Sequence, residues 1–336
     1  MNKHTFSGIP HRYKLRCWPI IGMIGLLLMT TLANAQSQET VRYIITQPAG
    51  ASVTLEGTLT LPATASRPVP VVLLIAGSGP TDRDGNAPGV TMNMYRQLAD
   101  SLTKRGMAVL RYDKRFSGTN MNAAAGQLLN QPLSFDYLID DAVGFIRQLQ
   151  ADKRFSKVVV AGHSEGSLVG MLAATRTQAD GFISIAGAGR NITDVLKTQF
   201  ADGGIQGEGL ALAHRDLDSL RAGMRVRHPF MLLASFFSPV NQPYLISWMQ
   251  YDPARSLQAY KGPVLLIQGR RDIQVSVGDV ERLKAARPDA RLVLIDTMNH
   301  VMKEGPADRA ANIESYAAPG SAILPALADA IAGFVR

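Results

Sequence analysis

The amino-acid sequence predicts an α/β fold, in which helices flank a mostly parallel central sheet and a helical cap is inserted late in the chain. Short apolar runs rich in β-branched residues alternate with helix-like segments from residue 71 onward, which is typical of buried parallel strands joined by helices. Before the strand pattern at Val264, a stretch of about 70 residues has helical periodicity and no strand pattern. These two observations define the expected architecture.

The expected strands follow one another along the chain. Residues 42–61 have the pattern of an antiparallel hairpin, and residues 322–335 that of a closing amphipathic helix. Strands of the parallel part are expected near residues 71–76, 107–112, 157–161, 182–186, 263–268 and 291–295. We therefore expect a core made of residues 36–188 and 262–336, with the cap insertion over residues 189–261.

The first 35 residues have the pattern of a removable signal peptide. Four basic residues precede an apolar run over residues 18–29, and Ala33-Asn34-Ala35 supplies small residues for cleavage before Gln36. The apolar run is shorter than the roughly 20 residues that a membrane span needs. We expect export to the periplasm or the exterior and no stable membrane anchor after cleavage, with an uncleaved anchor as the alternative.

Charge and cysteine content exclude several classes of protein. The formal net charge of +8 includes four basic residues of the leader, so the mature chain carries about +4. The remaining basic residues are mixed with acids, as in residues 113–115 and 152–154, and are expected on a solvated surface without a nucleic-acid partner. The one cysteine, Cys17, lies in the leader, so no disulfides are expected. No sequence pattern fixes the oligomeric state.

The strongest functional motif is Gly162-His163-Ser164-Glu165-Gly166, which lies between a strand pattern and a helical pattern. A serine at such a corner, with glycines two residues before and after it, is typical of a nucleophile elbow. The glycines are needed because side chains there would collide with the neighbouring strand and helix. We expect Ser164 to be a nucleophile.

A serine hydroxyl needs a histidine as base and a carboxylate that orients the base. Outside the leader, the sequence has four histidines: His163, His214, His228 and His300. The first is adjacent to Ser164 and should point away from it, and the next two lie in the helical insertion. His300 follows the strand at residues 291–295 by a short loop, so it is the expected base.

The acid is expected in the loop after the preceding strand, where Asp272 lies. Asp296 is the competitor, but it is only four residues from His300, which is a poor span for reaching back to the imidazole. We favour Asp272. Its alternative role is a turn residue that caps the helix expected after it.

Acyl transfer also needs two backbone N–H groups directed at the oxygen that becomes negative. One is expected from Glu165, the residue after the nucleophile. The other is expected from Gly77-Ser78-Gly79-Pro80, the loop after the strand at residues 71–76. We choose Ser78, with Gly77 as the fallback and a glycine turn without a catalytic role as the alternative.

Together these residues resemble the serine α/β-hydrolase superfamily, and within it the secreted bacterial esterase-like proteins related to the serine aminopeptidase type. Further stretches carry the resemblance: residues 76–86, 109–115, 251–254, 262–265 and 272–275. Two positions depart from the family pattern and could reshape the pocket mouth. Ala76 stands where many relatives have histidine, and Phe116 follows Arg115 where a glycine is usual. The resemblance implies the α/β-hydrolase fold, with the cap placed over the active site.

Most apolar side chains of the expected cap should form the cap's own core: Phe230, Met231, Leu232, Phe236, Phe237, Tyr244, Trp248 and Met249. Three cap arginines, Arg221, Arg225 and Arg227, are expected on a solvated helix face. Near the oxyanion loop, Asp82, Asp84 and Asn86 alternate as at the start of an EF-hand loop, but the following glycine and glutamate positions do not match. We expect Asx turns there and no metal.

We therefore expect an exported serine hydrolase that cleaves small carboxylic esters with short to medium acyl groups, without a metal or organic cofactor. The alternative is a serine peptidase of the aminopeptidase type. Such a peptidase would need cap carboxylates for a substrate ammonium group, and the available acids are Asp194, Glu208, Asp216 and Asp218. A third interpretation is a binding protein that has lost catalysis, but the complete set of catalytic motifs disfavours it.

Overall fold

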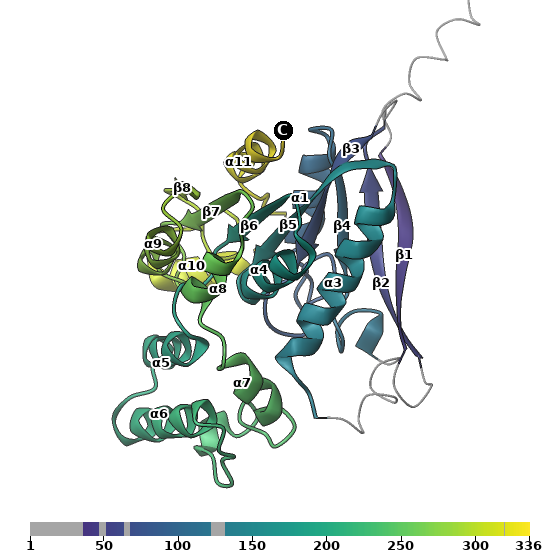
Figure 1. Cartoon of the computed structure of the whole chain (residues 1–336). Coiled ribbons are helices and arrows are strands. Elements are labelled where there is room, and N and C mark those ends of the chain that lie inside the picture. Colours follow the sequence, from purple (N-terminus) through teal and green to yellow (C-terminus); the bar gives the residue numbers. More distant parts are fainter. Residues whose placement is uncertain (1–35, 47–51, 64–67, 122–131, 319) are drawn as a thin grey trace, which may run out of the picture. The chain divides into compact units, whose positions relative to one another are not determined.

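The computed structural model describes residues 36–46, 52–63, 68–121, 132–318 and 320–336, and the expected leader lies outside them. One eight-stranded sheet runs through this part of the chain (Figure 1). Its strands are β1 (Ser37–Thr46), β2 (Ser52–Leu61), β3 (Val69–Ile75), β4 (Ala108–Tyr112), β5 (Phe155–His163), β6 (Gly181–Ile185), β7 (Val264–Gly269) and β8 (Arg291–Ile295). Their order across the sheet is β1-β2-β4-β3-β5-β6-β7-β8.

The sheet is mostly parallel, as predicted. β1 and β2 form an antiparallel hairpin, and β2 also pairs antiparallel with β4. The other neighbouring strands, from β4 through β3 to β8, are parallel. Their carboxyl ends therefore meet at one edge of the sheet, which is where α/β folds place their ligand sites.

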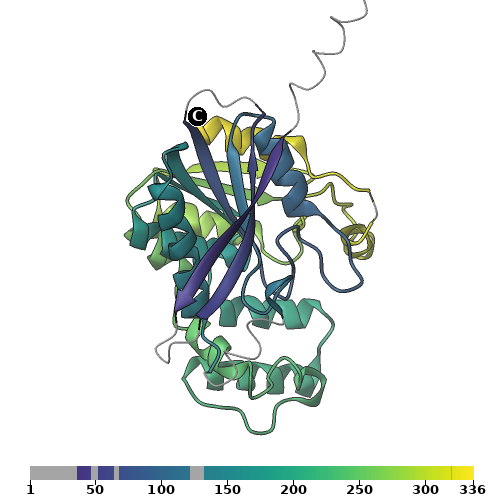
Figure 2. The ribbon, with the colours of Figure 1, turned by 90° about the vertical axis from the view of Figure 1, so that its right-hand side faces the viewer.

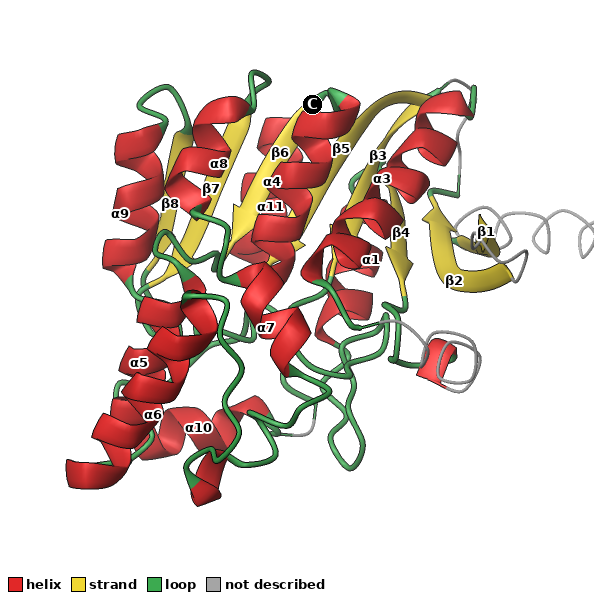
Figure 3. Cartoon of the chain, turned by 60° about the horizontal axis from the view of Figure 1, so that its bottom comes forward, coloured by secondary structure: helices red, strands yellow, loops and turns green. Residues whose placement is uncertain are grey.

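Helices cover both faces of the sheet (Figure 3). On one face lie α1 (Met94–Thr103) and α11 (Pro325–Val335), and on the other α3 (Phe135–Ala151), α4 (Glu165–Thr177) and α9 (Val277–Ala286). Successive residues of β3 alternate between two cores, because Leu73 packs on the α3–α4 side and Leu74 on the α1–α11 side. A strand buried on both faces explains why its sequence is apolar without alternation.

The segment between β6 and β7 is helical, as predicted. It contains α5 (Ile192–Asp202), α6 (Gly207–Arg221), the short 3₁₀ helix η1 (Met231–Leu233), α7 (Gln242–Trp248) and α8 (Pro253–Ala259). Figure 1 and Figure 2 both show α5, α6 and α7 gathered beyond one end of the sheet. By contrast, α8 packs against α4 and α9. The division into a core and a cap at residues 189 and 261 stays a prediction.

A further helix, α10 (Arg309–Tyr316), lies between β8 and α11 in the sequence. Of the helices that the structure describes, none combines the length and the apolar content of a membrane-crossing segment.

Candidate active site

Ser164 occupies the sharp turn between β5 and α4, with a φ angle of 54°. This left-handed conformation is uncommon for a residue with a side chain. The flanking glycines make the turn possible, because a Cβ at Gly162 would collide with the backbone oxygen of Gly166, and one at Gly166 with that of Ile75. The steric need for both glycines is thus confirmed, and the turn presents Ser164 at the carboxyl edge of the sheet.

The structure brings Ser164, His300 and Asp272 together. Nε2 of His300 lies 3.2 Å from Oγ of Ser164, and Nδ1 lies 2.8 Å from Oδ2 of Asp272. The three residues come from the loops and turns after β5, β8 and β7. Asp296, the competing acid, has an 85% exposed side chain and pairs with Arg270 instead.

The carboxylate of Asp272 is fully buried and hydrogen-bonded on both oxygens. Oδ1 accepts from the backbone N–H groups of Gln274 and Val275 at 2.8 and 2.9 Å, and Oδ2 also accepts from Gln268 Nε2 at 3.1 Å. Burial acts to raise the pKa of Asp272, but the facing His300 and the backbone donors lower it below its usual value. The ionised carboxylate therefore holds the proton of His300 on Nδ1.

The alternative role of Asp272, capping the next helix, is taken by another residue. Ser276 is the N-cap of α9 and forms a capping box with Asp279. Asp272 therefore does not cap this helix and is hydrogen-bonded to His300 instead.

His163 points away from Ser164, as expected. Its Nε2 lies 2.8 Å from the backbone oxygen of His300, and its Nδ1 lies 2.8 Å from the hydroxyl of Tyr95. Since only an N–H can donate to a carbonyl, Nε2 carries the hydrogen and Nδ1 accepts from Tyr95. Burial, followed by the nearby His300, lowers the pKa of His163 to about 3, so this ring is neutral.

The loop after β3 approaches the elbow from the other side. The N–H of Gly77 donates to the Tyr95 hydroxyl at 2.8 Å, so this amide, the fallback oxyanion donor, is already engaged. The N–H groups of Ser78 and Glu165 have no hydrogen-bond acceptor in the described part of the chain. These are the two amides that the sequence predicted for the oxyanion hole.

A buried polar cluster surrounds the side chain of Glu165. Oε1 lies 3.1 Å from Nζ of Lys114, while Oε2 accepts from Ser78 Oγ at 2.9 Å and from the Tyr244 hydroxyl at 2.6 Å. Lys114 also donates to the backbone oxygen of Gly77. This cluster was not predicted, because its members come from four separate segments that only the fold brings together.

The expectation that residues 113–115 lie on a solvated surface is wrong. Asp113, Lys114 and Arg115 are 1%, 6% and 9% exposed. Each has an opposite charge beside it: Arg83 for Asp113, Glu165 for Lys114 and Asp141 for Arg115. Alternating charges in a sequence are equally compatible with a set of buried ion pairs, and here the partners lie far away along the chain.

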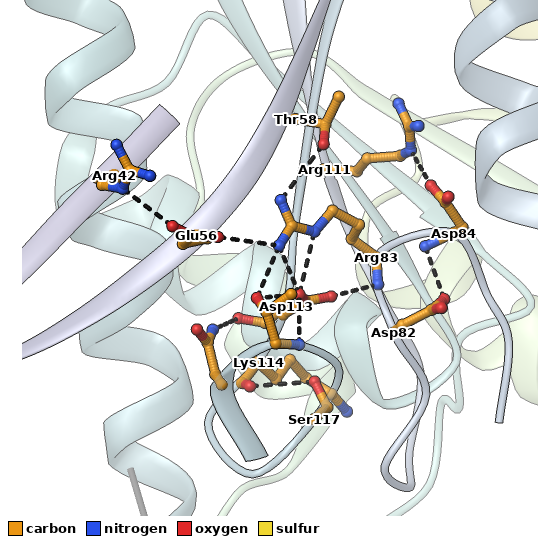
Figure 4. A network of polar contacts seen from close by, with 12 residues as sticks. Arg42, Glu56, Thr58, Asp82, Arg83, Asp84, Arg111, Asp113, Lys114 and Ser117 are labelled. Atoms are coloured by element: carbon orange, nitrogen blue, oxygen red, sulfur yellow. Dashed lines mark hydrogen bonds and ion pairs between the residues drawn. The ribbon is translucent and has the colours of Figure 1, made fainter. Parts of the chain in front are cut away.

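Figure 4 shows how Asp113, directly after β4, binds Arg83 in the continuation of the loop after β3, while Arg83 also contacts Thr58 of β2. Asp113 accepts from the backbone N–H of Arg83 at 2.6 Å and from its guanidinium at 2.6 and 3.0 Å. Burial acts to raise the pKa of Asp113, but Arg83 and Thr119 lower it below its usual value. Ser117 Oγ donates to the backbone oxygen of Lys114 at 3.0 Å and so holds the backbone at Lys114.

Residues 82–86 form the expected Asx turn. Oδ1 of Asp82 accepts from the N–H groups of Asp84 and Asn86 at 2.9 and 2.8 Å, and Asp84 pairs with Arg111 at 2.8 Å (Figure 4). The carboxylates of this loop therefore bind groups of the protein itself. No cluster of potential metal ligands is found among the described residues.

A cavity of about 700 Å³ is lined by Ser164, His300 and the polar cluster around Glu165. Three of the apolar insertion residues considered above also line it: Phe236, Tyr244 and Trp248. Others lie elsewhere, since Phe237 and Met249 are buried outside the lining and Met231 is 87% exposed. Arg221, Arg225 and Arg227 are exposed, as expected, but only Arg221 lies on a helix, because α6 ends there and the other two are in the loop that follows.

The two departures from the family pattern differ in their effect. Phe116 lines the cavity and has a φ angle of 63°, a conformation that glycine adopts without strain. A bulky side chain thus replaces the usual glycine at the wall of the pocket. Ala76, in contrast, is buried in the core on the α1–α11 side and has no place in the lining of the described cavity.

The sheet order and the site together define the class of protein. A serine at the elbow after β5, with an aspartate after β7 and a histidine after β8, lies at the carboxyl edge of a mostly parallel sheet covered by helices on both faces. This is the α/β-hydrolase fold.

Comparison with known proteins agrees with this class. Residues 89–207 match the family described as serine aminopeptidase, S33. Esterase EstD of Thermotoga maritima is 29% identical over 255 residues, which are 75% of this chain and 58% of that protein. The chain thus spans less than two thirds of that relative's length.

Solved structures of esterases share the fold at low sequence identity. Est1E of Butyrivibrio proteoclasticus, solved with ferulic acid, has a TM-score of 0.54 and 16% identity, covering 78% of this chain and 91% of that one. The esterase domain of a Rhodothermus marinus protein has a TM-score of 0.52 and 16% identity, covering 89% of this chain and 100% of that one.

Proposed function

We propose that this protein is a serine hydrolase that cleaves carboxylic esters through an acyl-enzyme. The observation that carries the proposal is the hydrogen-bonded series Ser164–His300–Asp272 at the elbow. Ser164 attacks the ester carbonyl, and His300 takes its proton and then gives it to the leaving alcohol. Asp272 holds the imidazole in the required tautomer and stabilises the imidazolium. Water, activated by His300, releases the acid, and the sequence of steps needs no metal or organic cofactor.

The proposed oxyanion hole consists of the N–H groups of Ser78 and Glu165. Both amides lack an acceptor in the described residues, whereas the neighbouring N–H of Gly77 is bound to Tyr95. Each such donor typically contributes about 100- to 1,000-fold to kcat.

The charges around the pocket support ester substrates over aminopeptidase substrates. An aminopeptidase needs an available carboxylate for the substrate ammonium, but none of the four insertion acids lines the described cavity. Three of them pair with basic residues of the insertion, as shown by Asp194–Arg221, Asp216–Arg215 and Asp218–Lys197. The carboxylate of Glu165 does line the cavity, but its oxygens already face three donors. The similarity to EstD supports the same choice.

The decisive test is hydrolysis of p-nitrophenyl esters from acetate to palmitate by the wild type and by Ser164→Ala. We expect turnover that falls with acyl length, because the cavity is of limited size, and that disappears in the variant. An unchanged Tm would show that the variant is folded. Turnover that survives in a clean preparation of Ser164→Ala would exclude the proposed nucleophile. Cleavage of aminoacyl-arylamides without cleavage of esters would favour the peptidase alternative.

We also propose that the protein is exported and that its mature chain begins at Gln36. The basic stretch, the apolar run and the small residues before Gln36 support this. Intact mass of the protein from the periplasm or the medium of its host should match residues 36–336. A mass that includes the leader would indicate an uncleaved anchor.

A further inference from the structure

A buried lysine holds the loop that carries the proposed oxyanion donor. Lys114 follows β4, and its side chain is 7% exposed. Its ammonium group donates to the backbone oxygen of Gly77 and lies 3.1 Å from Oε1 of Glu165. Burying an ammonium is costly unless it is paired and hydrogen-bonded. The Ser164–His300–Asp272 series makes no use of this group, so its position calls for another explanation.

The oxygen of Gly77 and the N–H of Ser78 belong to the same peptide unit, and this unit is trans. In a trans peptide the C=O and the N–H lie in one rigid plane and point in opposite directions. An ammonium that binds the oxygen therefore fixes the direction of the N–H. It also polarises the peptide, since a hydrogen bond at the C=O strengthens the donor at the N–H.

We propose that Lys114 is a positioning residue that orients and polarises the Gly77–Ser78 peptide for stabilisation of the oxyanion. The inference rests on the proposed function, because it assigns the Ser78 N–H to the oxyanion hole. Lys114 acts through the peptide and forms no bond with the reacting atoms. The preceding peptide unit, Ala76–Gly77, is also fixed, because the N–H of Gly77 donates to Tyr95 at 2.8 Å.

The carboxylate of Glu165 explains why the site needs the ammonium group of Lys114. Its backbone N–H is the second proposed oxyanion donor, yet its buried carboxylate would repel the negative charge that develops there. Lys114 compensates this charge, and Ser78 Oγ and Tyr244 donate to the remaining oxygen. Removal of the ammonium should therefore weaken the transition state in two ways: the Ser78 amide loses its orientation, and the carboxylate loses its counter-ion.

The test compares Lys114→Met with the wild type in kcat, KM and the inhibition constant of an aryl trifluoromethyl ketone. The ketone forms a tetrahedral adduct with Ser164 and places an oxyanion in the hole. We expect kcat to fall about 100-fold and the affinity for the ketone to fall in parallel, as for the loss of an oxyanion donor. KM should change much less, because the ground-state ester gains little from the hole.

Chemical rescue distinguishes the ammonium from the side-chain volume. The mature chain is expected to contain no other cysteine, so Lys114→Cys can be alkylated selectively while unfolded and then refolded. Bromoethylamine restores an ammonium at nearly the same length, and should return kcat to within about threefold of the wild type if the charge is required. Alkylation of the same cysteine with a neutral propyl reagent should leave kcat low. The aminoethylated and propylated forms of Lys114→Cys also replace Lys114→Met in the test if that variant does not fold.

Asp141→Asn is the matched control for stability. Asp141 forms an equally buried ion pair with Arg115 at 2.6 Å, which does not involve Gly77 or Glu165. We expect this control to lower Tm without changing the ratio of ketone affinity to KM. If Lys114→Met lowers Tm but keeps the kcat and ketone affinity of the wild type, Lys114 is structural only and the inference is wrong, although the hydrolase proposal stands. A wild type that neither cleaves esters nor binds the ketone would overturn both.

Discussion

Ser164 keeps its backbone in a conformation that costs a residue with a side chain roughly 1–3 kcal/mol. The turn enforces this conformation through Gly162 and Gly166, which leave room for the close passage of β3, β5 and α4. Exposure of the hydroxyl therefore depends on two positions where any side chain would collide with backbone atoms, and backbone cannot move aside as the end of a flexible side chain does.

Gly166→Ala should consequently damage both the fold and the site. Its new Cβ would collide with the backbone oxygens of Ile75 and Ala76, so we expect a Tm lower by several degrees and a loss of ester turnover. Thermal unfolding and kcat measure the two effects. Gly278→Ala is the control, because Gly278 lies in α9 and a Cβ there would meet only Ser276 Oγ at 3.5 Å, an ordinary contact, so alanine should keep or raise Tm. Equal behaviour of the two variants would contradict the steric argument.

The sequence predicted Ser164, Asp272 and His300 because each lies at the end of a strand with a clear local pattern. The residues around them have no such signal. Glu165 bonds to Ser78 and Tyr244, which are 87 and 79 residues away, and nothing local marks these partners. The one available hint was the run Asp113-Lys114-Arg115 directly after a buried strand, at the edge where ligand sites form.

At the scale of elements, α7 is hydrogen-bonded to the polar cluster around Glu165 through Tyr244. Tyr244 donates to Glu165 at 2.6 Å, while Phe135 of α3 stacks on Trp248 with centroids 5.4 Å apart. Burial, followed by the charge of Glu165, raises the pKa of Tyr244 well above its usual value, so its hydroxyl stays protonated and keeps donating. The insertion is thereby joined to Glu165 at the start of α4 by a polar contact and to α3 by an aromatic one.

Tyr244→Phe should therefore lower kcat/KM without abolishing turnover, because Ser164, His300 and Asp272 are unchanged. Loss of a donor to a buried carboxylate corresponds to about 1.5–3 kcal/mol, and we expect part of it to appear as a 3- to 10-fold lower kcat/KM. Tyr251→Phe is the control, since Tyr251 also donates to a carboxylate, that of Asp136, but does not line the described cavity. An effect of the same size on kcat/KM in the control would show that the loss is not specific to Glu165.

The strands and the helical insertion could be predicted because their patterns are local and repeat over many residues. β3 is apolar throughout, and β5 and β7 contain uninterrupted apolar runs at residues 158–161 and 264–267, as is typical of buried strands. The observed parallel strands begin and end within a few residues of the expected positions. The side chains that line the pocket could not be ranked in advance. Phe236 and Phe237 are adjacent and identical in type, yet the first lines the cavity and the second is fully buried elsewhere.

For the whole molecule, the buried His163 predicts a dependence of stability on pH. Its pKa is lowered to about 3 in the folded state, against roughly 6.5 in an unfolded chain. The unfolded state therefore binds a proton that the folded state does not, below about pH 6.5. The stabilisation is complete above that pH and is lost as the pH falls, with a slope approaching about 1.4 kcal/mol per pH unit.

The measurement is the free energy of unfolding by urea between pH 7 and pH 4.5, for the wild type and for His163→Gln. We expect a smaller slope in the variant, whatever its stability at pH 7. The lowered pKa values of Asp113 and Asp272 act in the same direction but only near and below about pH 4, outside this range. His228→Gln, at an exposed position, should keep the slope of the wild type. Identical slopes in all three proteins would show that His163 does not cause the pH dependence.

The hydrogen-bonded series Gly77–Tyr95–His163–His300 joins the loop after β3, helix α1, the end of β5 and the loop after β8 without using the hydroxyl of Ser164. The pocket is therefore assembled independently of the hydroxyl that we propose as the nucleophile. Ser164→Ala should consequently act as a substrate trap, in which an intact ester stays bound because nothing consumes it. Mass spectrometry of small molecules that co-purify with this variant, and not with the wild type, offers a route to the natural substrate.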